Sequence, residues 1–201
     1  MESRQLHQDF TFPKNYEVRV LESYGLVNPL ERFLQFPAEL EESERTGIYM
    51  RVVPKQGNAW IGFFSLGFDS DQVVNAIYSC PDADSLCVVA GGYGYVVNAS
   101  DPARWIRVEQ QPVVDVRALL EQKLLLFTGF HTITAISPAG LLWTTERLSW
   151  DGISISRIDH ATLHGQGWDA IADKEAPFEV DLATGKHTGG SRPGKPSGDR
   201  T

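Results

Sequence analysis

Three glycines recur along this chain at equal spacing. Position 129 lies midway between positions 91 and 167, and each of Gly91, Gly129 and Gly167 comes after a short run of strand-forming residues. A further strand-like run and a turn follow each glycine, in VVNASDPARW, TAISPAGLLW and EVDLATGKHT. A fixed interval of this length indicates a structural repeat, and each repeat has room for four short strands.

Between residues 47 and 188 the apolar segments are short, rich in β-branched and aromatic residues, and separated by turn residues. One four-stranded unit cannot bury both of its faces, so neighbouring units must pack on each other. We therefore predict a mainly β fold of about three to four propeller-like, four-stranded antiparallel units, as a partial or small propeller. Residues 47–68 would supply the fourth unit. An open twisted stack and a sandwich are equally compatible with the pattern.

The two ends of the chain differ from this region. In the first, Tyr16, Val20 and Leu21 recur at helical spacing after Pro13, and Asn28-Pro29 precedes a second apolar group. These patterns predict a short helical or irregular N-terminal cap over residues 1–46. The propeller-like domain would span residues 47–188. Residues 189–201 are rich in Gly, Pro, Ser and charge, which predicts a flexible tail.

The segment EVDLATGK, residues 179–186, resembles part of a known repeat class. A strand that ends in a D-L-x-T-G-K turn is similar to the repeats of pyrroloquinoline-quinone-like and WD-like propellers. The resemblance covers roughly residues 73 to 190, although the second copy has SPAGLL at this place and the third contains the insertion IADKEAP. It implies blade topology, and it carries over no cofactor and no catalytic residue.

Charge and composition argue against several classes of function. The formal charge is −8 and the pI is near 5.1, with no cluster of Lys and Arg, so nucleic-acid binding is not expected. No apolar run is long enough to cross a bilayer, and the N-terminus lacks the pattern of a secretory signal. We expect a soluble, cytoplasmic protein without membrane contact. Cys80 and Cys87 are then small apolar residues, unless a hairpin brings them together to oxidise.

The segment HGQGWDA, residues 164–170, raises the question of an active-site loop. Its register places it with VVAGGYG and LFTGFHT in the other copies, so we interpret it as a turn whose glycine has a positive φ. The glycines of AGGYGY precede a strand and no helix, which argues against a phosphate loop. Asp82 and Asp84 lack the remaining residues of a calcium loop and fit a hairpin turn.

Catalytic and metal sites have weak support. There is no G-x-S-x-G motif, and His131, His160 and His164 would have to meet in space to form a triad. His160 and His164 are four residues apart, which in a strand separates them by about 13 Å, too far to share one zinc ion. We predict no catalytic residues, no metal and no cofactor.

The repeat predicts an interaction surface. Tyr93, Phe130, His131, Trp168 and Asp169 fall at the same place in three successive copies, and we call these residues the predicted rim. Trp105 and Trp143 share another offset and are expected to pack between units. The predicted function is a non-enzymatic protein-binding module, of adaptor or immunity type, that binds a protein partner through this rim. The alternatives are a small-ligand-binding protein or hydrolase with a central site that uses the three histidines, and a structural subunit whose open β edge pairs with another chain.

Overall fold

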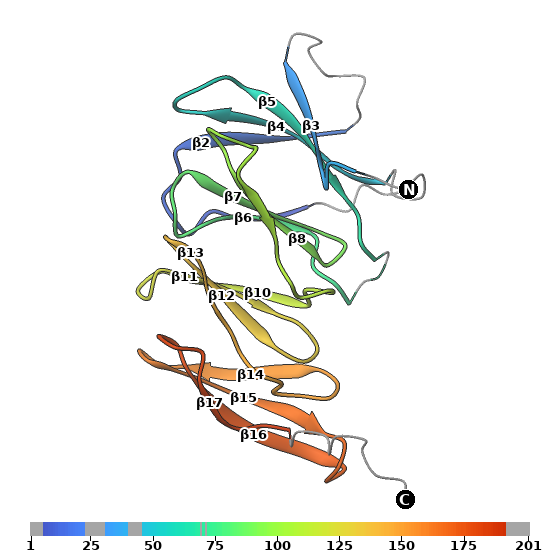
Figure 1. The fold of residues 1–201 in the computed structure, drawn as a ribbon, viewed down its shortest axis with the longest axis vertical. Helices are drawn as coiled ribbons and strands as arrows, with labels where there is room; N and C mark the ends of the chain where they lie inside the picture. The colour runs from blue at the N-terminus through green and yellow to red at the C-terminus, as the bar shows by residue number, and fades with distance from the viewer. Residues whose placement is uncertain (1–5, 23–30, 40–45, 69, 71, 192–201) are drawn as a thin grey trace, which may run out of the picture.

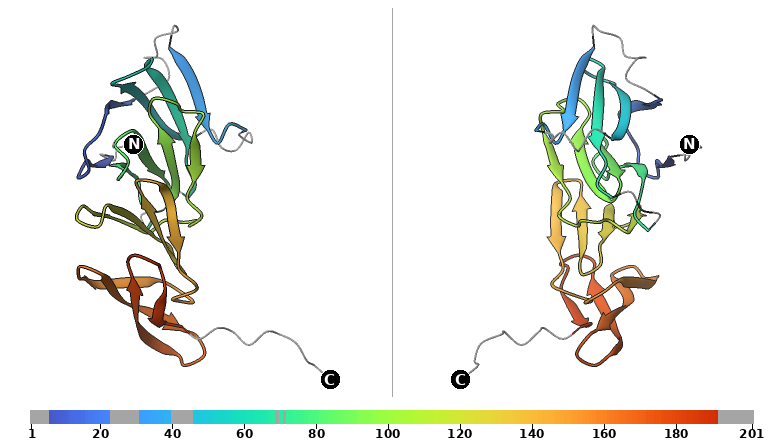
Figure 2. Two further views of the ribbon diagram at one scale, coloured as in Figure 1. Left: turned by 60° about the vertical axis from the view of Figure 1, so that its left-hand side comes forward. Right: turned by 90° about the vertical axis from the view of Figure 1, so that its right-hand side faces the viewer.

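The computed structural model describes residues 6–22, 31–39, 46–68, 70 and 72–191. Within these residues the protein is all β, with strands in four mostly antiparallel sheets and no helix. The sheets are stacked face to face along the longest axis of the molecule, so that the first and the fourth lie at opposite ends (Figures 1 and 2). None of them closes on itself, and the stack is open.

The first and second sheets contain the three strands that the structure describes in the N-terminal segment. The first sheet has the order β2-β4-β5-β3 and the second has the order β1-β6-β7-β8-β9. The strands of the first sheet are β2 (Tyr16–Leu21), β3 (Arg32–Phe36), β4 (Gly47–Pro54) and β5 (Trp60–Ser65). Those of the second are β1 (His7–Asp9), β6 (Ala76–Ser79), β7 (Ser85–Ala90), β8 (Tyr93–Asn98) and β9 (Trp105–Arg107).

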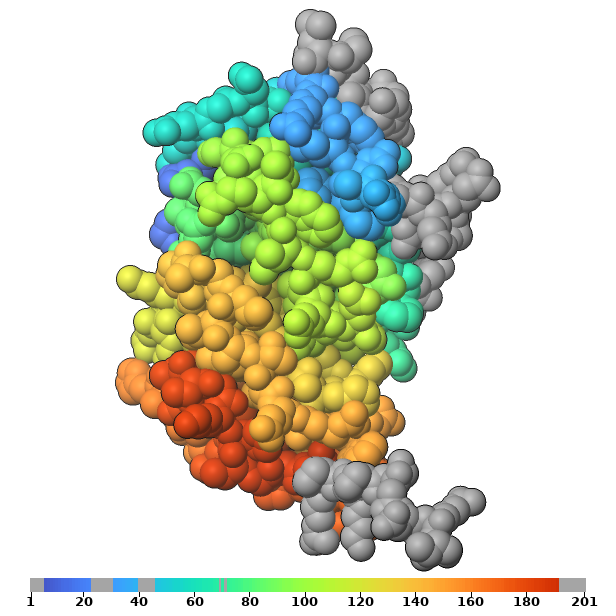
Figure 3. Space-filling view, in the orientation of Figure 1, coloured from blue at the N-terminus to red at the C-terminus, as the bar shows by residue number. Residues whose placement is uncertain are grey.

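The third and fourth sheets are simple antiparallel meanders. The third comprises β10 (Asp115–Leu119), β11 (Leu124–Thr128), β12 (Ile133–Ser137) and β13 (Gly140–Thr144). The fourth comprises β14 (Ile153–Ile158), β15 (Thr162–Asp169), β16 (Lys174–Asp181) and β17 (His187–Gly189). The prediction of repeated four-stranded antiparallel units is confirmed at this level. In the space-filling view the four sheets form successive bands along the molecule (Figure 3).

The predicted N-terminal helix is wrong for the part of this segment that the structure describes. Tyr16 and Val20, whose spacing predicts a helix, are four residues apart and so also share one face of β2, whereas Leu21 lies on the other face; β2 pairs antiparallel with β4. β3 and β1 run parallel to β5 and β6, respectively. The second expected helix begins at Asn28-Pro29, outside the described residues, but its remaining part, with Phe33 and Leu34, lies in the strand β3, so this helix is wrong there as well. The division at residue 47 stays a prediction, but β4, which begins there, pairs with β2.

Three apolar clusters join the sheets in pairs. Tyr16, Phe64 and Val88 belong to the cluster between the first and second sheets. Val89 and Phe127 belong to the cluster between the second and third, and Leu126 and Phe178 to that between the third and fourth. Both middle sheets are thus apolar on both faces. In the fourth sheet, by contrast, buried residues of β15 alternate with exposed ones, so its outer face is largely polar.

The cysteines belong to the second of these clusters. Cys80 and Cys87 are both buried and free, and burial in apolar surroundings raises the pKa of each thiol. The two residues therefore pack as small apolar side chains, as predicted from their number and context.

The prediction of a turn at HGQGWDA is wrong. Residues 164–169 lie within β15, where Gly165 and Gly167 pair with Phe178 and Ala176 of β16. Of the three repeating glycines, Gly91 has a positive φ, of 56°, and Gly129 and Gly167 do not. What the three share is close approach of a linker between sheets. A Cβ at Gly91, Gly129 or Gly167 would meet the linker atoms of Phe68, Gln110 and Leu148, respectively.

The interval between the repeating glycines differs by one residue from the interval that separates structurally equivalent residues of the second and third sheets. Val88 and Val97 face the first sheet, but Leu126 and Ala135, which lie one glycine interval later, face the fourth. A shift of one residue inverts the faces of a strand. Trp105 therefore packs back onto Phe36 of the first sheet, and Trp143 packs forward onto the fourth. Packing of both tryptophans between units is confirmed, but in opposite directions.

Substitution at Gly167 tests the role of linker contact. The variant Gly167→Ala is expected to lower the free energy of unfolding by about 3 kcal/mol, because the new methyl group overlaps the carbonyl of Leu148. Gly152→Ala is the control, since Gly152 has a φ of 77° and open space around it. It is expected to cost about 1 kcal/mol from backbone strain alone. Urea denaturation measures both, and equal costs would contradict the role of linker contact.

Candidate interaction surface

The linker between the third and fourth sheets anchors two neighbouring chain segments. Leu148 donates its N–H to the carbonyl of His131, in the loop between β11 and β12 (2.8 Å). The hydroxyl of Ser149 accepts hydrogen bonds from the N–H groups of Trp168 and Asp151 (2.8 and 3.1 Å). Trp150 then donates its N–H to the carbonyl of Trp168 (2.9 Å). Leu148 and Ser149 are fully buried, and their hydrogen bonds fix the backbone of both segments.

Several aromatic residues and an arginine lie on this linker or on the segments that it holds. His131 is exposed, and its Nδ1 lies 3.2 Å from the carbonyl oxygen of Ser149. The ring of Phe130 is 6.5 Å from that of His131. The guanidinium of Arg147 lies over the ring of Trp150, 4.4 Å from its centroid, and Trp168 is 36% exposed. We call this set the aromatic patch: Phe130, His131, Arg147, Trp150 and Trp168.

The structure brings together only part of the predicted rim. The ring of His131, which neighbours that of Phe130, contacts the carbonyl of Ser149, and the backbone N–H of Trp168 donates to the Ser149 hydroxyl. The side chain of Trp168 itself lies on the exposed face of β15. Asp169 is only 3% exposed, and its Oδ1 accepts hydrogen bonds from the N–H groups of Ile171 and Ala172, in the turn between β15 and β16. This pattern is a local turn cap, which accounts for the residue without a partner protein.

Tyr93 belongs to a different linker. Its ring contacts Phe68, with 5.6 Å between centroids, and the guanidinium of Arg107 lies 5.3 Å from the centre of the same ring. None of the contacts among the described residues joins Tyr93 to the aromatic patch. The prediction of one continuous rim rested on the equal spacing of the glycines, but this spacing is one residue shorter than the interval between equivalent strand pairs of the second and third sheets, Leu86↔Val97 and Leu125↔Ile136.

Arg147 was missed by the sequence argument, and Trp150 was predicted only as a residue close to a turn that would be a good anchor for a partner if exposed. The sequence places Trp150 close to a turn, but nothing in it places this residue beside Trp168. The signal that would have found them is the position of ERLSW immediately before a predicted strand, where a linker must cross the preceding sheet. Linkers of this kind carry function more often than core strands do.

The three histidines do not form one site. His131 contacts Ser149, and His160 lies 3.3 Å from Glu121 at the opposite turns of the third and fourth sheets. His164, on the outer face of the fourth sheet, has a carboxylate at each ring nitrogen. Its Nε2 is 3.0 Å from Asp159, and its Nδ1 is 3.2 Å from Glu179. A general base needs a ring nitrogen free for its substrate, and here both are engaged.

The comparisons with known proteins add no identity. The sequence matches no protein-family model, and a search of curated proteins gives no significant match. Among the described residues, no helix is long and apolar enough to span a membrane. The candidate surface therefore rests on its own geometry.

Ser149 is expected to hold the aromatic patch in place. Ser149→Ala leaves the N–H groups of Trp168 and Asp151 without their acceptor, which is expected to cost about 2 kcal/mol of stability. Ser154→Ala, at an exposed position of β14, serves as the control and is expected to change stability by less than about 0.5 kcal/mol. Thermal and urea denaturation give the comparison. Equal stabilities of the two variants would show that the linker hydroxyl is dispensable.

Proposed function

We propose that this protein is a non-enzymatic interaction module that binds a protein partner through the aromatic patch. The observation that carries the proposal is that one buried linker holds the segments that carry Trp150, Trp168, Phe130, His131 and Arg147. Tryptophan and arginine are enriched among the residues that dominate binding energy in protein interfaces. Chain segments whose backbone is already held by hydrogen bonds lose little backbone freedom on binding, which favours affinity.

For the architecture, we infer that the four sheets are blades of an open, partial propeller. Three observations support this inference: the face-to-face stack, the meander order of the third and fourth sheets, and the turn of EVDLATGK. In that turn Asp181 accepts hydrogen bonds from the N–H and hydroxyl of Thr184, and Gly185 has a φ of 71°. Hydrogen bonds from Thr184 lower the pKa of the Asp181 carboxyl. The hydrolase alternative has no comparable observation in its favour.

Site-specific crosslinking tests the interaction proposal. A photoreactive amino acid at position 168 is expected to crosslink one protein from a lysate of the source organism, in stoichiometric amount. The control position is 120, since Leu120 is also exposed and apolar but lies at the turn between β10 and β11. Equal labelling from both positions, or no discrete product from position 168, would overturn the proposal. Crosslinking between copies of this chain would instead identify the patch as a site of self-association.

The purified partner then permits a quantitative test. Trp168→Ala is expected to weaken binding about thirtyfold, because an aromatic anchor of an interface contributes about 2 kcal/mol. Leu120→Ala should bind with unchanged affinity. Isothermal titration calorimetry measures both variants, and circular dichroism checks that each retains its fold. A Trp168→Ala variant that binds as the wild type does would place the interface elsewhere.

A further inference from the structure

Two of the three interfaces between sheets contain the same tryptophan contact. The indole Nε1 of Trp60, in the first sheet, donates to the carbonyl of Ala99 in the second (2.8 Å). The indole Nε1 of Trp143, in the third sheet, donates to the carbonyl of Leu182 in the fourth (2.9 Å). Ala99 and Leu182 occupy equivalent positions. In the second sheet, Asn98 ends the penultimate strand and caps the next turn, and Ala99 follows it. In the fourth sheet, Asp181 has the same place, and Leu182 follows it.

The interface between the second and third sheets has a pocket at the corresponding place. Here the penultimate strand, β12, ends at Ser137, whose hydroxyl caps the turn by accepting the N–H of Ala139. Pro138 therefore corresponds to Ala99 and Leu182, and among the described residues no indole donates to it. Trp105 lines the pocket, but its ring packs on Phe36 of the first sheet. Ile106, which is 43% exposed, occupies the facing position on β9. The pocket has a volume of about 270 Å³.

Two glycines show the difference between the interfaces directly. Gly140 and Gly185 both follow a penultimate strand and both have a positive φ. A Cβ at Gly185 would be 2.7 Å from the indole of Trp143, whereas a Cβ at Gly140 would meet nothing within 4 Å. The space that an indole fills in the fourth sheet is thus open in the third. Its volume is near the lower end for small-molecule sites, which suits a compact ring system.

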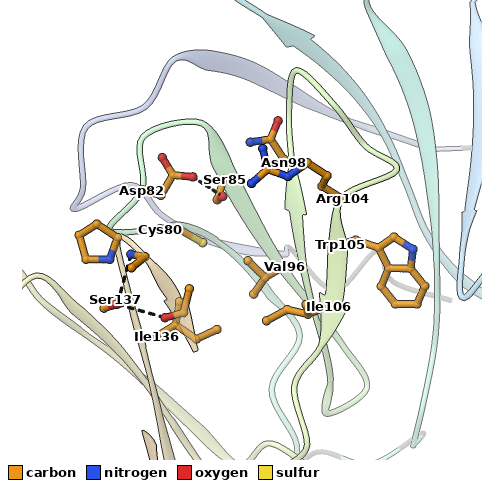
Figure 4. Close-up of a pocket in the computed structure, with 13 residues that line it drawn as sticks. Cys80, Asp82, Ser85, Val96, Asn98, Arg104, Trp105, Ile106, Ile136 and Ser137 are labelled. Carbon is orange, nitrogen blue, oxygen red and sulfur yellow. Dashed lines mark hydrogen bonds between the residues drawn. The ribbon is translucent and has the colours of Figure 1, made fainter. Parts of the chain in front are cut away.

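The pocket has an apolar floor and one cation that is not used elsewhere. Val96, Ile106 and Ile136 line the floor (Figure 4). The guanidinium of Arg104 lies at the upper edge of the pocket and makes no ion pair or hydrogen bond with the residues that the structure describes. The carboxylate of Asp82, across the pocket, already accepts hydrogen bonds from the N–H of Asp84 and the hydroxyl of Ser85.

We propose that this pocket binds a small indole carboxylate. Its indole ring lies on the apolar floor, its ring N–H donates to the carbonyl of Pro138, and its carboxylate pairs with Arg104. The protein itself provides the precedent, since its own indoles make the corresponding hydrogen bond in the other two interfaces. The charge of the ligand follows from the unpaired cation. This site is separate from the aromatic patch, so it is independent of the proposed function.

Titrations with matched probes test the chemistry of the ligand. Indole-3-propionate is expected to shift the amide resonances of Ile106, Ile136 and Gly140 in ¹⁵N-edited NMR spectra. Its N-methyl derivative, which lacks the donor, should bind about fivefold more weakly. Tryptamine, which carries a positive charge, should also bind more weakly than the propionate. An absence of shifts at these residues with indole-3-propionate, or equal affinity for the three probes, would overturn the proposal.

Two pairs of variants test the location. Ile106→Trp places an indole of the chain itself in the pocket and is expected to abolish binding of indole-3-propionate, whereas Leu142→Trp, at an exposed position of β13, should leave binding unchanged. Arg104→Met should weaken binding about fivefold, as expected for a partly exposed ion pair, and Arg107→Met should not. If Ile106→Trp fails to fold, the arginine pair still decides the question. Equal binding by Arg104→Met and Arg107→Met would show that Arg104 does not hold the carboxylate.

Discussion

Each of the two middle sheets is apolar on both faces, and this requires a neighbour on either side. Burial of apolar area is the dominant favourable contribution to folding, and a four-stranded sheet with two apolar faces cannot obtain it alone. The strands β7 and β11 contribute residues to the clusters on both of their faces, and they are buried along almost their entire length. At the fourth sheet the stack ends with an outer face that is largely polar. On this face the Nδ1 of His164 lies 3.2 Å from a carboxylate oxygen of Glu179.

Because stacking buries both faces of the middle sheets, the surface of these sheets that is available for recognition lies at strand ends, linkers and outer edges. The aromatic patch and the pocket between the second and third sheets are both located there, but they are built differently. The patch is built on a buried linker whose backbone and hydroxyl make hydrogen bonds to the segments on either side. The pocket is instead a local gap between an edge strand and a hairpin turn. A rigid support suits a macromolecular interface, and a gap with defined donors and acceptors suits a small ligand.

Much of the strand pattern could be predicted from sequence, because runs such as SLCVVA and KLLLFT have the composition and length of buried strands. The repeated four-stranded unit was predictable for the same reason. The N-terminal strands were not, because β1 and β3 are held by parallel pairing with segments far along the chain, and no local pattern encodes such partners. HGQGWDA was misassigned because its glycines were interpreted as turn residues. In the structure they are needed because Phe178 and Leu148 pack too close to leave room for a side chain.

The candidate sites depend on a feature that sequence analysis could not supply, the face to which each strand residue points. Trp105 and Trp143 occupy the same place in the sequence repeat, yet they lie on opposite faces of their sheets. The pair Leu86↔Val97 of the second sheet corresponds to the pair Leu125↔Ile136 of the third, and both of its members lie one residue further along than the glycine interval would place them, so residues one glycine interval apart point to opposite faces. This one-residue shift has two consequences. It leaves Trp143 to join the third sheet to the fourth, and it turns Trp105 away from the turn at Pro138, so that the second and third sheets meet around an open pocket.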